Sequence, residues 1–497
     1  MNEQPKQFKW VGTRAIRPDG VDKVTGRAMY GADLSLPGMV EGKVVRSPHA
    51  HARIISIDTS KAEALNGVTA VITAADMPVA DSKPVASGEA MINFKDLANN
   101  VLAREKALYE GQAVAAVAAK TADIAEQAAA LIVVNYEVLP HVIDVMEAIK
   151  EDAPVLHDDM FTGGVKPKPE KASNVANRVE FALGDADAGF AAADLVIERQ
   201  FTTEPVHQGY IEPHAVVADM NPDGKVDVFC SSQGHFMVRA FCSQLLHIEM
   251  SKIKVTAAEI GGGFGGKTTV YLEPLAIMLS RKSGRPVRMT MSREEVFRGS
   301  GATSGAAMTI KMGATKDGKI TGAYAELYLQ AGAFPGSPVG PAAMTAFAPY
   351  DLANVKVVGF DVVSNRQKVV AYRAPGAPIS EYGVESVVDE LASELGIDPI
   401  EIRSMNGAKE GTQAAYGVKF GTIGFQETLD AAKATEHFKT PLGPNQGRGV
   451  ASGFWFNIGG ESCAGIRINE DGSISLTEGS PDNGGSRASM ALMAAEN

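Results

Sequence analysis

The stretch EIGGGFGGKTTV, residues 259–270, has the residue types and spacing of a phosphate-binding loop. It fits the P-loop pattern G-x-x-x-x-G-K-[ST] from Gly261 to Thr268, and the dinucleotide fingerprint G-x-G-x-x-G from Gly261 to Gly266. In both patterns, backbone N–H groups of a glycine-rich turn bind phosphate at the start of a helix. The stretch therefore suggests an ATPase, a nicotinamide enzyme, or a protein that needs a glycine-rich turn for another ligand.

Neither phosphate-binding pattern has its usual partners elsewhere in the chain. A P-loop protein needs a second strand that ends in aspartate, but Asp361 is expected in the middle of its strand. A dinucleotide site needs an acidic residue about 20 positions further on, whereas Glu294 and Glu295 lie farther away, at an expected helix start. The glycines could instead supply positive φ in a tight turn. They could also let the backbone approach a large planar ligand such as a pterin, with Phe264 packed beside it.

The composition argues against several classes of protein. The chain has 497 residues, a net charge of −12 and no long basic run, so a nucleic-acid surface is not expected. The cysteines Cys230, Cys242 and Cys463 are too scattered for a zinc or iron–sulfur site and suit a reducing compartment. The N-terminus lacks the apolar core of a signal peptide, and no apolar run is long enough to cross a membrane. We therefore expect a cytoplasmic protein without a membrane segment.

Two regions with different patterns must position these residues. Strands and helices alternate in the first region, with strands expected at 41–48, 52–59, 68–73, 112–119 and 132–140 and helices at 60–67 and 121–131. After a stretch rich in Pro, Lys, Asp and Gly, hairpins are predicted at the Asp-Gly pairs 223–224, 317–318 and 471–472. Helices are predicted at 269–284, 381–396 and 397–407, the last with Asp398 as N-cap and Pro399 as its first residue. The predicted fold class is α+β.

Seven stretches, in order along the chain, resemble one known family. They run from about residue 46 to the last residues, and together they are far more specific than any one motif. The stretches are RSPHAHARIISID (46–58), YEGQAVAAVAAKTADIAEQAAALIVVNYEVLP (109–140), HQGYIEPHAVVAD (207–219), SSQGHFMVR (231–239), EIGGGFGGK (259–267), AYRAPGAPISEYGVESVVDELASELGIDPIEIRSMN (371–406) and EGSPDNGGSRASMALMAAE (478–496). The chain resembles the large, molybdopterin-binding subunit of the xanthine dehydrogenase and aldehyde oxidase family, the molybdenum hydroxylases. On this resemblance, the P-loop match is coincidental.

The resemblance implies a domain order. Residues 20–145 would form an α/β domain like the family's "hammerhead", and 146–178 a linker. Residues 179–425 would form a first, mixed α/β molybdopterin-binding domain, and 440–497 the incomplete start of a second.

The family's chemistry implies cofactors and partners. Its members oxidise a carbon next to nitrogen or oxygen, with water as the oxygen source, and pass electrons through two [2Fe–2S] clusters to a flavin. The chain would hold the molybdenum–pterin cofactor, either molybdopterin or its cytosine dinucleotide, with the metal bound by the pterin rather than by protein ligands. Because the chain lacks cysteines for the clusters, an iron–sulfur subunit and an FAD subunit are the expected partners.

The resemblance assigns cofactor-binding roles to individual residues. Gln233 matches a glutamine that hydrogen-bonds near the metal's oxo ligand, and Gly263, Phe264 and Gly265 match the turn over pterin and metal. Arg373 matches an arginine near metal and pterin. From the residues alone, Gln233 could instead cap a turn, and Arg373 could form a structural ion pair.

A second glycine turn is assigned to the phosphate end of the cofactor. Its residues are Gly484, Gly485, Ser486 and Arg487. Ser486 could also be the N-cap of the helix that follows, which is compatible with phosphate binding at that helix N-terminus.

Three positions depart from well-known members and bear on the substrate pocket. Thr268 stands where xanthine-type members have glutamate, and Pro375 where they have a phenylalanine that stacks on substrate. Ala374 stands where carbon monoxide dehydrogenases have a reactive cysteine. An aldehyde or an aromatic N-heterocycle is therefore the expected substrate.

The family's general base has no counterpart here. It is a glutamate that relatives carry beyond the position matching Asn497. We therefore expect either an incomplete chain or a split enzyme, with the base on a second molybdopterin subunit. Two alternatives stay open at this point: a P-loop nucleotide-binding protein, and a non-catalytic subunit or fragment.

Overall fold

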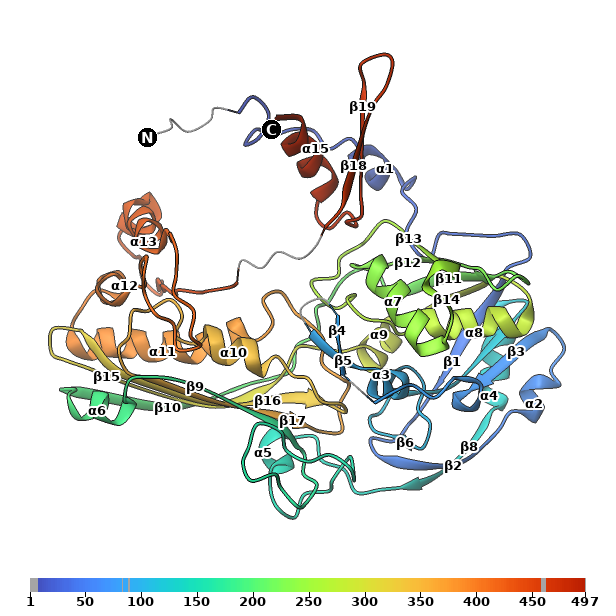
Figure 1. Ribbon diagram of the computed structural model, residues 1–497, viewed down its shortest axis with the longest axis horizontal. Helices are drawn as coiled ribbons and strands as arrows, with labels where there is room; N and C mark the ends of the chain where they lie inside the picture. The colour runs from blue at the N-terminus through green and yellow to red at the C-terminus, as the bar shows by residue number, and fades with distance from the viewer. Residues whose placement is uncertain (1–7, 83, 88–89, 457–461, 497) are drawn as a thin grey trace. The chain divides into compact units, whose positions relative to one another are not determined.

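The computed structural model describes residues 8–82, 84–87, 90–456 and 462–496. Its contacts divide the chain into two units, each formed by segments that are separate in the sequence. Figure 1 shows the helices and strands of both units. Unit 1 consists of Met1–Leu139, His207–Gly301 and Gly459–Asn497, and unit 2 of Pro140–Val206 and Ala302–Ile458.

Unit 1 contains a seven-stranded mixed sheet with the order β13-β12-β11-β14-β1-β7-β3. Two neighbouring pairs, β1 with β14 and β12 with β13, are parallel, and the other neighbours are antiparallel. A smaller sheet has the order β6-β2-β8. The strands of the large sheet are β1 (Val40–Arg46), β3 (Val68–Thr73), β7 (Ala113–Ala119), β11 (Ala215–Met220), β12 (Val226–Cys230), β13 (Ile253–Ala257) and β14 (Val287–Thr290), and those of the smaller one are β2 (Ala52–Asp58), β6 (Lys106–Ala107) and β8 (Val133–Val138).

The N-terminal half of unit 1 follows its sequence pattern closely. All seven residues of β7, AVAAVAA, are buried between β1 and β3. The helix α4 (Ala122–Leu131) packs against β1 and β7, and the Thr121 hydroxyl caps it by accepting from the N–H of Ile124. Small alanine side chains bring helix and sheet together, so the strand–helix–strand order predicted for 112–140 is confirmed.

Unit 2 contains a five-stranded sheet with the order β10-β15-β16-β17-β9. The long helix α11 (Ala377–Leu395) and the short α10 (Val339–Thr345) cover one face of it (Figure 1). Buried residues recur along α11 at helical spacing, among them Val384, Val387, Val388 and Leu391, and form a core with β15 and β16. The strands are β9 (Val175–Leu183), β10 (Leu195–Thr203), β15 (Ala306–Ala314), β16 (Ile320–Gly332) and β17 (Val355–Val363).

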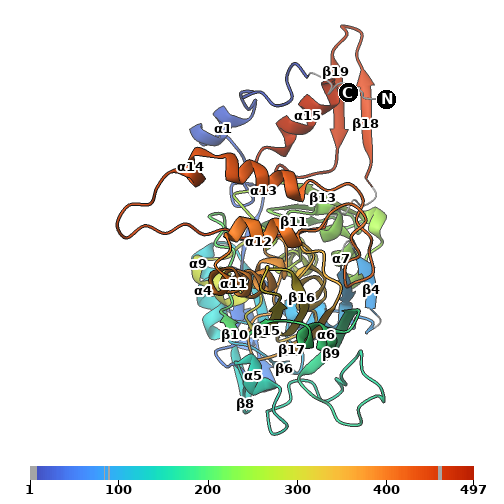
Figure 2. The same cartoon turned by 90° about the vertical axis from the view of Figure 1, so that its left-hand side faces the viewer.

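The two ends of the chain meet within unit 1. The helix α15 (Ser486–Glu496) lies next to the hairpin of β18 (Ala464–Ile468) and β19 (Ile474–Glu478) in both views (Figures 1 and 2). The helix α1 (Gly20–Thr25) is bound to the turn before α15 through Lys23 and Asp482. The Glu496 carboxylate accepts from the N–H groups of Trp10 and Val11 at 2.8 and 3.1 Å. The N-terminal segment is thereby fixed to the last helix.

Several predicted turns and helix ends are confirmed. The three Asp-Gly pairs connect β11 to β12, β15 to β16 and β18 to β19, each an antiparallel pair. Gly396 ends α11 in the left-handed conformation. Asp398 caps α12 (Pro399–Asn406), its carboxylate accepting from the N–H groups of Ile400 and Glu401.

Two expectations differ from the structure. The helix predicted for 269–284 is α8 (Glu273–Ser283), so the residues that directly follow Thr268 are not helical. The stretch 146–178, predicted to be a linker, takes part in the core of unit 2: it includes most of α5 (Val145–Ala148) and the start of β9, and it buries Leu156. Polar composition suggested a linker, but the Asn174 side chain is buried and donates to the carbonyls of Ala148 and Pro154. The domain boundaries themselves stay a prediction.

Candidate functional site

The glycine-rich stretch forms a loop directly after β13 in unit 1. Its backbone is left-handed at Gly262, Phe264 and Gly265, with φ of 93°, 54° and 102°. For phenylalanine this conformation is strained, and such strain is concentrated at functional sites. The Phe264 side chain is 47% exposed, so packing in the core does not account for it.

Gln233 positions this loop from the segment that precedes α7 (His235–Leu246). Its Oε1 accepts from the N–H groups of Gly265 and Lys267 at 2.8 and 3.2 Å. A Cβ on Gly263 would lie 2.4 Å from that same oxygen, so only glycine fits there while Gln233 keeps this position. The structure thus brings Gln233, Gly263, Phe264 and Gly265 together. Gln233 was also considered as a residue that caps a turn, and the turn that it caps is this loop.

The crest of the loop carries free hydrogen-bond donors. Among the described residues, the N–H groups of Gly262, Gly263 and Phe264 have no acceptor, while those of Gly261, Gly265, Gly266 and Lys267 are all bonded. Gly263 is buried, and an unsatisfied buried N–H group is costly. Successive N–H groups in a turn with left-handed residues form a concave site for anionic or oxygen-rich ligands.

Lys267 cannot act as the lysine of a P-loop. Its side chain has 0% exposure, and Nζ lies 2.7 Å from Oε2 of Glu212 and 5.0 Å from the centre of the Tyr210 ring. Burial lowers the pKa of Lys267, an effect that Glu212 opposes. Thr268 donates its hydroxyl to the Gly265 carbonyl at 2.7 Å. Both residues that should contact phosphate and Mg²⁺ in a P-loop are therefore engaged within the protein.

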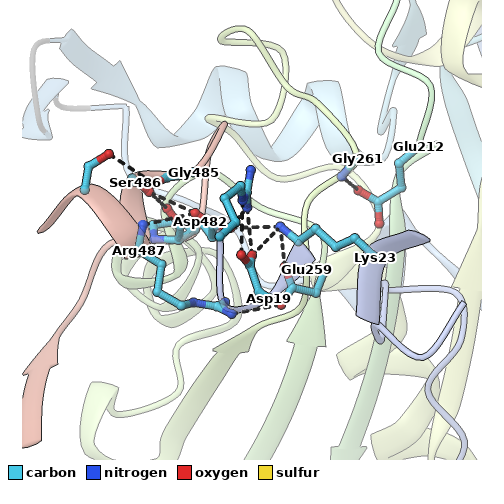
Figure 3. Close-up of polar contacts among 12 residues, drawn as sticks. Asp19, Lys23, Glu212, Glu259, Gly261, Asp482, Gly485, Ser486 and Arg487 are labelled. Atoms are coloured by element: carbon cyan, nitrogen blue, oxygen red, sulfur yellow. Dashed lines mark hydrogen bonds and ion pairs between the residues drawn. The ribbon is translucent and has the colours of Figure 1, made fainter. Parts of the chain in front are cut away.

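The second glycine turn lies in the same unit, at the start of α15. Gly484 and Gly485 are left-handed, with φ of 67° and 99°. The carboxylate of Asp482, rather than Ser486, caps the helix: Oδ1 accepts from the N–H of Arg487 at 3.1 Å (Figure 3). Ser486 was considered as the N-cap, but it is the first helical residue, and its hydroxyl is near the carbonyl of Pro481 at 3.2 Å.

Figure 3 shows how Asp482 connects this turn to the first loop. The Asp482 Oδ2 accepts from Arg17 and Lys23 at 2.7 and 2.8 Å. Glu259, immediately before the glycine loop, pairs with Lys23 at 3.0 Å and with Arg487 at 3.1 Å. The two predicted cofactor-binding stretches are therefore held together by ion pairs across more than 200 positions of sequence.

The carboxylates of Asp19, Glu259 and Asp482 converge closely enough to suggest a metal site. The Lys23 ammonium lies 2.8 to 3.1 Å from an oxygen of each and compensates their charge. Burial opposes the charge on Lys23, but its hydrogen bonds to the three carboxylates outweigh this effect and raise the pKa of the amine. The cluster is thus an ion-pair network.

The other predicted site residues lie in unit 2, in the turn before α11. Arg373 and Ala374 have positive φ, of 23° and 63°. Gly376, the residue before the helix, has φ of 91°, and a Cβ there would lie 2.5 Å from the Pro338 carbonyl oxygen. Arg373 is exposed and, among the described residues, forms no ion pair, so the structural ion pair considered for it is not observed. Pro375 is half-buried beside it.

Behind the glycine loop is a buried polar network that the sequence did not reveal. The Tyr210 hydroxyl lies 2.7 Å from Nε2 of His214 and 3.2 Å from the Ser300 hydroxyl. His207 contacts that same hydroxyl through Nε2 at 3.0 Å and accepts the N–H of Gly209 through Nδ1. Burial and nearby Arg293 lower the pKa of His207 to about 4, so this imidazole is neutral and structural at neutral pH.

Sequence reasoning also missed Arg17, Lys23 and Asp482. Arg17 and Lys23 lie more than 450 positions from Asp482, and only the proximity of Asp482 to the second glycine turn could have marked it.

Comparison with known proteins agrees with this architecture. Residues 25–140 match the family model "Aldehyde oxidase and xanthine dehydrogenase, a/b hammerhead domain". Residues 167–407 match "Molybdopterin cofactor-binding domain".

Individual relatives extend over most of the chain. The nicotinate dehydrogenase large molybdopterin subunit of Eubacterium barkeri is 32% identical, over 86% of this chain and 96% of its own length. The carbon monoxide dehydrogenase large chain of Afipia carboxidovorans is 34% identical, over 81% of this chain and 51% of its own. Among solved structures, quinoline 2-oxidoreductase from Pseudomonas putida superimposes with a TM-score of 0.84 at 26% identity, covering 99% of this chain and 65% of that one.

The chain therefore belongs to the molybdopterin-binding xanthine dehydrogenase and aldehyde oxidase family, whose members are oxidoreductases of the molybdenum hydroxylase type. The predicted family, fold class and molybdenum–pterin cofactor are confirmed, and the P-loop alternative has no support. The chain spans about half to two thirds of most of these relatives, and nearly all of the nicotinate dehydrogenase subunit. No helix among the described residues is long and apolar enough to cross a membrane.

Proposed function

We propose that this chain holds the molybdenum–pterin cofactor of a hydroxylase that oxidises an aromatic N-heterocycle. The observation that carries the proposal is the loop crest beside Gln233, where three N–H groups have no acceptor among the described residues. An N-heterocycle is favoured over an aldehyde because the relative of which this chain covers 96% is named for nicotinate.

The residues present fit such a cofactor. A Cβ at Gly263 would clash with the Gln233 side chain, so the glycine keeps this space open. Gly263 is buried, and the described residues supply no acceptor for its N–H group. The second turn offers left-handed Gly484 and Gly485, with the guanidinium of Arg17 3.2 Å from the position of a Cβ on Gly485. This turn suits the phosphate end of the cofactor, with the cytosine dinucleotide as one possible form.

The roles of the chain's own residues follow from these contacts. The chemistry that the bound cofactor supplies is two-electron oxidation of a carbon next to nitrogen, with water as the oxygen source. Gln233 and the N–H groups of Gly262 to Phe264 would bind and orient the cofactor. Arg373, which has positive φ, would be a further cofactor contact, as the resemblance to the family implies. Thr268 donates into the loop, so it supports the backbone rather than recognising a substrate as a glutamate would. Pro375 would line the substrate pocket.

We propose iron–sulfur and FAD subunits as partners. The described cysteines Cys230 and Cys242 are buried and Cys463 is exposed, so they offer no cluster ligand set. The relatives carry names such as "large molybdopterin subunit", "large chain" and "subunit gamma". A second molybdopterin subunit is a further proposed partner, because the relative of which this chain covers 96% is named a "large" molybdopterin subunit. The cytoplasmic location stays a prediction from the sequence.

The test is metal, pterin and polypeptide analysis of the native complex, followed by substrate-dependent bleaching of its visible absorption. We expect molybdenum, iron and flavin, with nicotinate-like or quinoline-like compounds bleaching faster than aldehydes. Gln233→Ala should lower molybdenum content, while Gln446→Ala should not, although Gln446 likewise accepts a glycine N–H, that of Gly443, at 2.8 Å. A native complex without molybdenum would refute the proposal.

A further inference from the structure

Glu212 joins three segments of unit 1 through one buried carboxylate. Its Oε2 accepts from the N–H of Gly261 at 2.8 Å and from Nζ of Lys267 at 2.7 Å. Its Oε1 accepts from the N–H of Gly31 at 3.3 Å. The Glu212 side chain is 9% exposed, so these contacts are shielded from water.

These contacts hold both ends of the glycine loop. At one end, Glu212 and Gly261 bond twice, because the N–H of Glu212 also donates to the Gly261 carbonyl at 3.1 Å. At the other end, Lys267 is bound to Glu212 through its side chain and to Gln233 through its N–H. The free N–H groups of Gly262, Gly263 and Phe264 lie between these anchors.

Without the anchors, the loop would have little reason to keep its shape. Glycine gains more freedom than any other residue when it is released, and the left-handed Phe264 would relax. The loop has no helix or strand hydrogen bonds of its own between Gly261 and Lys267. Within the loop, the N–H of Gly266 donates to the Gly263 carbonyl and the Thr268 hydroxyl to the Gly265 carbonyl. The N–H groups of Gly261, Gly265 and Lys267 depend on acceptors supplied by Glu212 and Gln233.

We propose that Glu212 is a positioning residue for cofactor binding: through its bond to Gly261, and with its charge neutralised by Lys267, it sets the glycine loop in the binding conformation before the cofactor arrives. This inference rests on the proposed function, since it concerns the same site. The Glu212 oxygen that accepts from the N–H of Gly261 does the positioning, while Lys267 compensates the buried charge of the carboxylate.

The two roles can be separated with paired substitutions. E212Q/K267M removes both charges but keeps an amide oxygen to accept from Gly261. E212A/K267M is equally neutral and has no acceptor. The measurements are hydrogen–deuterium exchange of the Gly261, Gly265 and Lys267 amides in the cofactor-free full chain, and molybdenum per chain in the complex purified under identical conditions.

We expect E212Q/K267M to exchange within about threefold of the wild-type rate and to retain molybdenum. E212A/K267M should exchange about tenfold faster or more at Gly261, as expected when the hydrogen-bond acceptor of this N–H is removed, and should lose most of its molybdenum. A matched control is Arg403→Met in unit 2, which breaks a buried pair with Glu385 of similar exposure, 0% and 7%. It should leave exchange in the loop unchanged.

Equal exchange rates and molybdenum contents in the two double variants would overturn the inference, as would an equal effect of Arg403→Met on the loop. The exchange measurement needs no cofactor. If the wild-type complex holds no molybdenum while exchange follows the expected order, the proposed function fails and the structural contact of Glu212 with the loop remains.

Discussion

Replacing Gly263 with alanine would place a Cβ 2.4 Å from Oε1 and 2.6 Å from Cδ of Gln233. No positive φ is needed at this position, so the effect of the substitution is steric. The amide must move away, and it would lose its bonds with the N–H groups of Gly265 and Lys267. Two such bonds at about 1 kcal/mol each, with some strain from overpacking, give a loss of about 2 to 3 kcal/mol in the free energy of unfolding.

The assay is urea unfolding followed by circular dichroism, with a double-mutant cycle. Gly263→Ala should cost this amount in the wild type but little in a Gln233→Ala background, because the clash is then gone. Gly449→Ala is the control: a Cβ there would meet no atom within 4 Å, and the change should stay within about 0.5 kcal/mol. Additive costs of the Gly263 and Gln233 substitutions would refute the reasoning.

Three further perturbations probe other contacts. Lys267→Met should lower the free energy of unfolding by about 3 to 5 kcal/mol, because it leaves the buried carboxylate of Glu212 without its ion-pair partner. Calorimetry should detect no ATP binding by the wild type. If the wild type bound ATP and Lys267→Met abolished that binding, the P-loop hypothesis would be restored. Gly376→Ala combines φ of 91° with a Cβ 2.5 Å from the Pro338 oxygen and should lower the free energy of unfolding by about 2 to 4 kcal/mol. Gly417→Ala, with φ of 97° and no atom within 4 Å of the new Cβ, should lower it by about 1 kcal/mol. Equal shifts in Tm for the two variants would show that the clash with Pro338 contributes nothing. Burial and the nearby carboxylate of Glu385 raise the pKa of Glu381 from 4.5 to about 7. Between these pH values the folded state holds a proton that the unfolded state has lost, so the free energy of unfolding should fall as pH rises from 4.5 to 7. Glu381→Gln should flatten this slope in urea titrations carried out across the same pH range.

Local signals in the sequence predicted much of the fold. The Asp-Gly pairs, the glycine that ends α11 and the Asp398-Pro399 start of α12 each act within a few residues, so their structure could be read directly. The helix after the glycine loop was placed four residues too early, because the apolar pattern of 269–272 does not show that the chain must first leave the loop.

The contacts within the candidate site were harder to predict, because they join residues that lie far apart in the sequence. Gln233 and the loop residues were assigned through the resemblance to the family, and the structure brings them together. The buried ion pair of Lys267 could not be predicted from the sequence, because its partner Glu212 lies 55 positions away. Either residue alone looks like an exposed charge or a ligand. The parallel pairing of β1 with β14 spans almost 250 positions, and no pattern in either strand specifies its neighbour.

The bonds of Arg17 and Lys23 to Asp482 have a consequence for biosynthesis. Their sequence separations are 465 and 459 residues, so these contacts cannot form until Asp482 has been translated. At typical ribosome speeds of about 5 to 20 residues per second, the N-terminal segment waits roughly 20 to 90 s for its partner. The ion pairs at the second glycine turn can therefore form only much later in synthesis than the Glu212–Lys267 pair of the first loop, whose residues lie 55 positions apart.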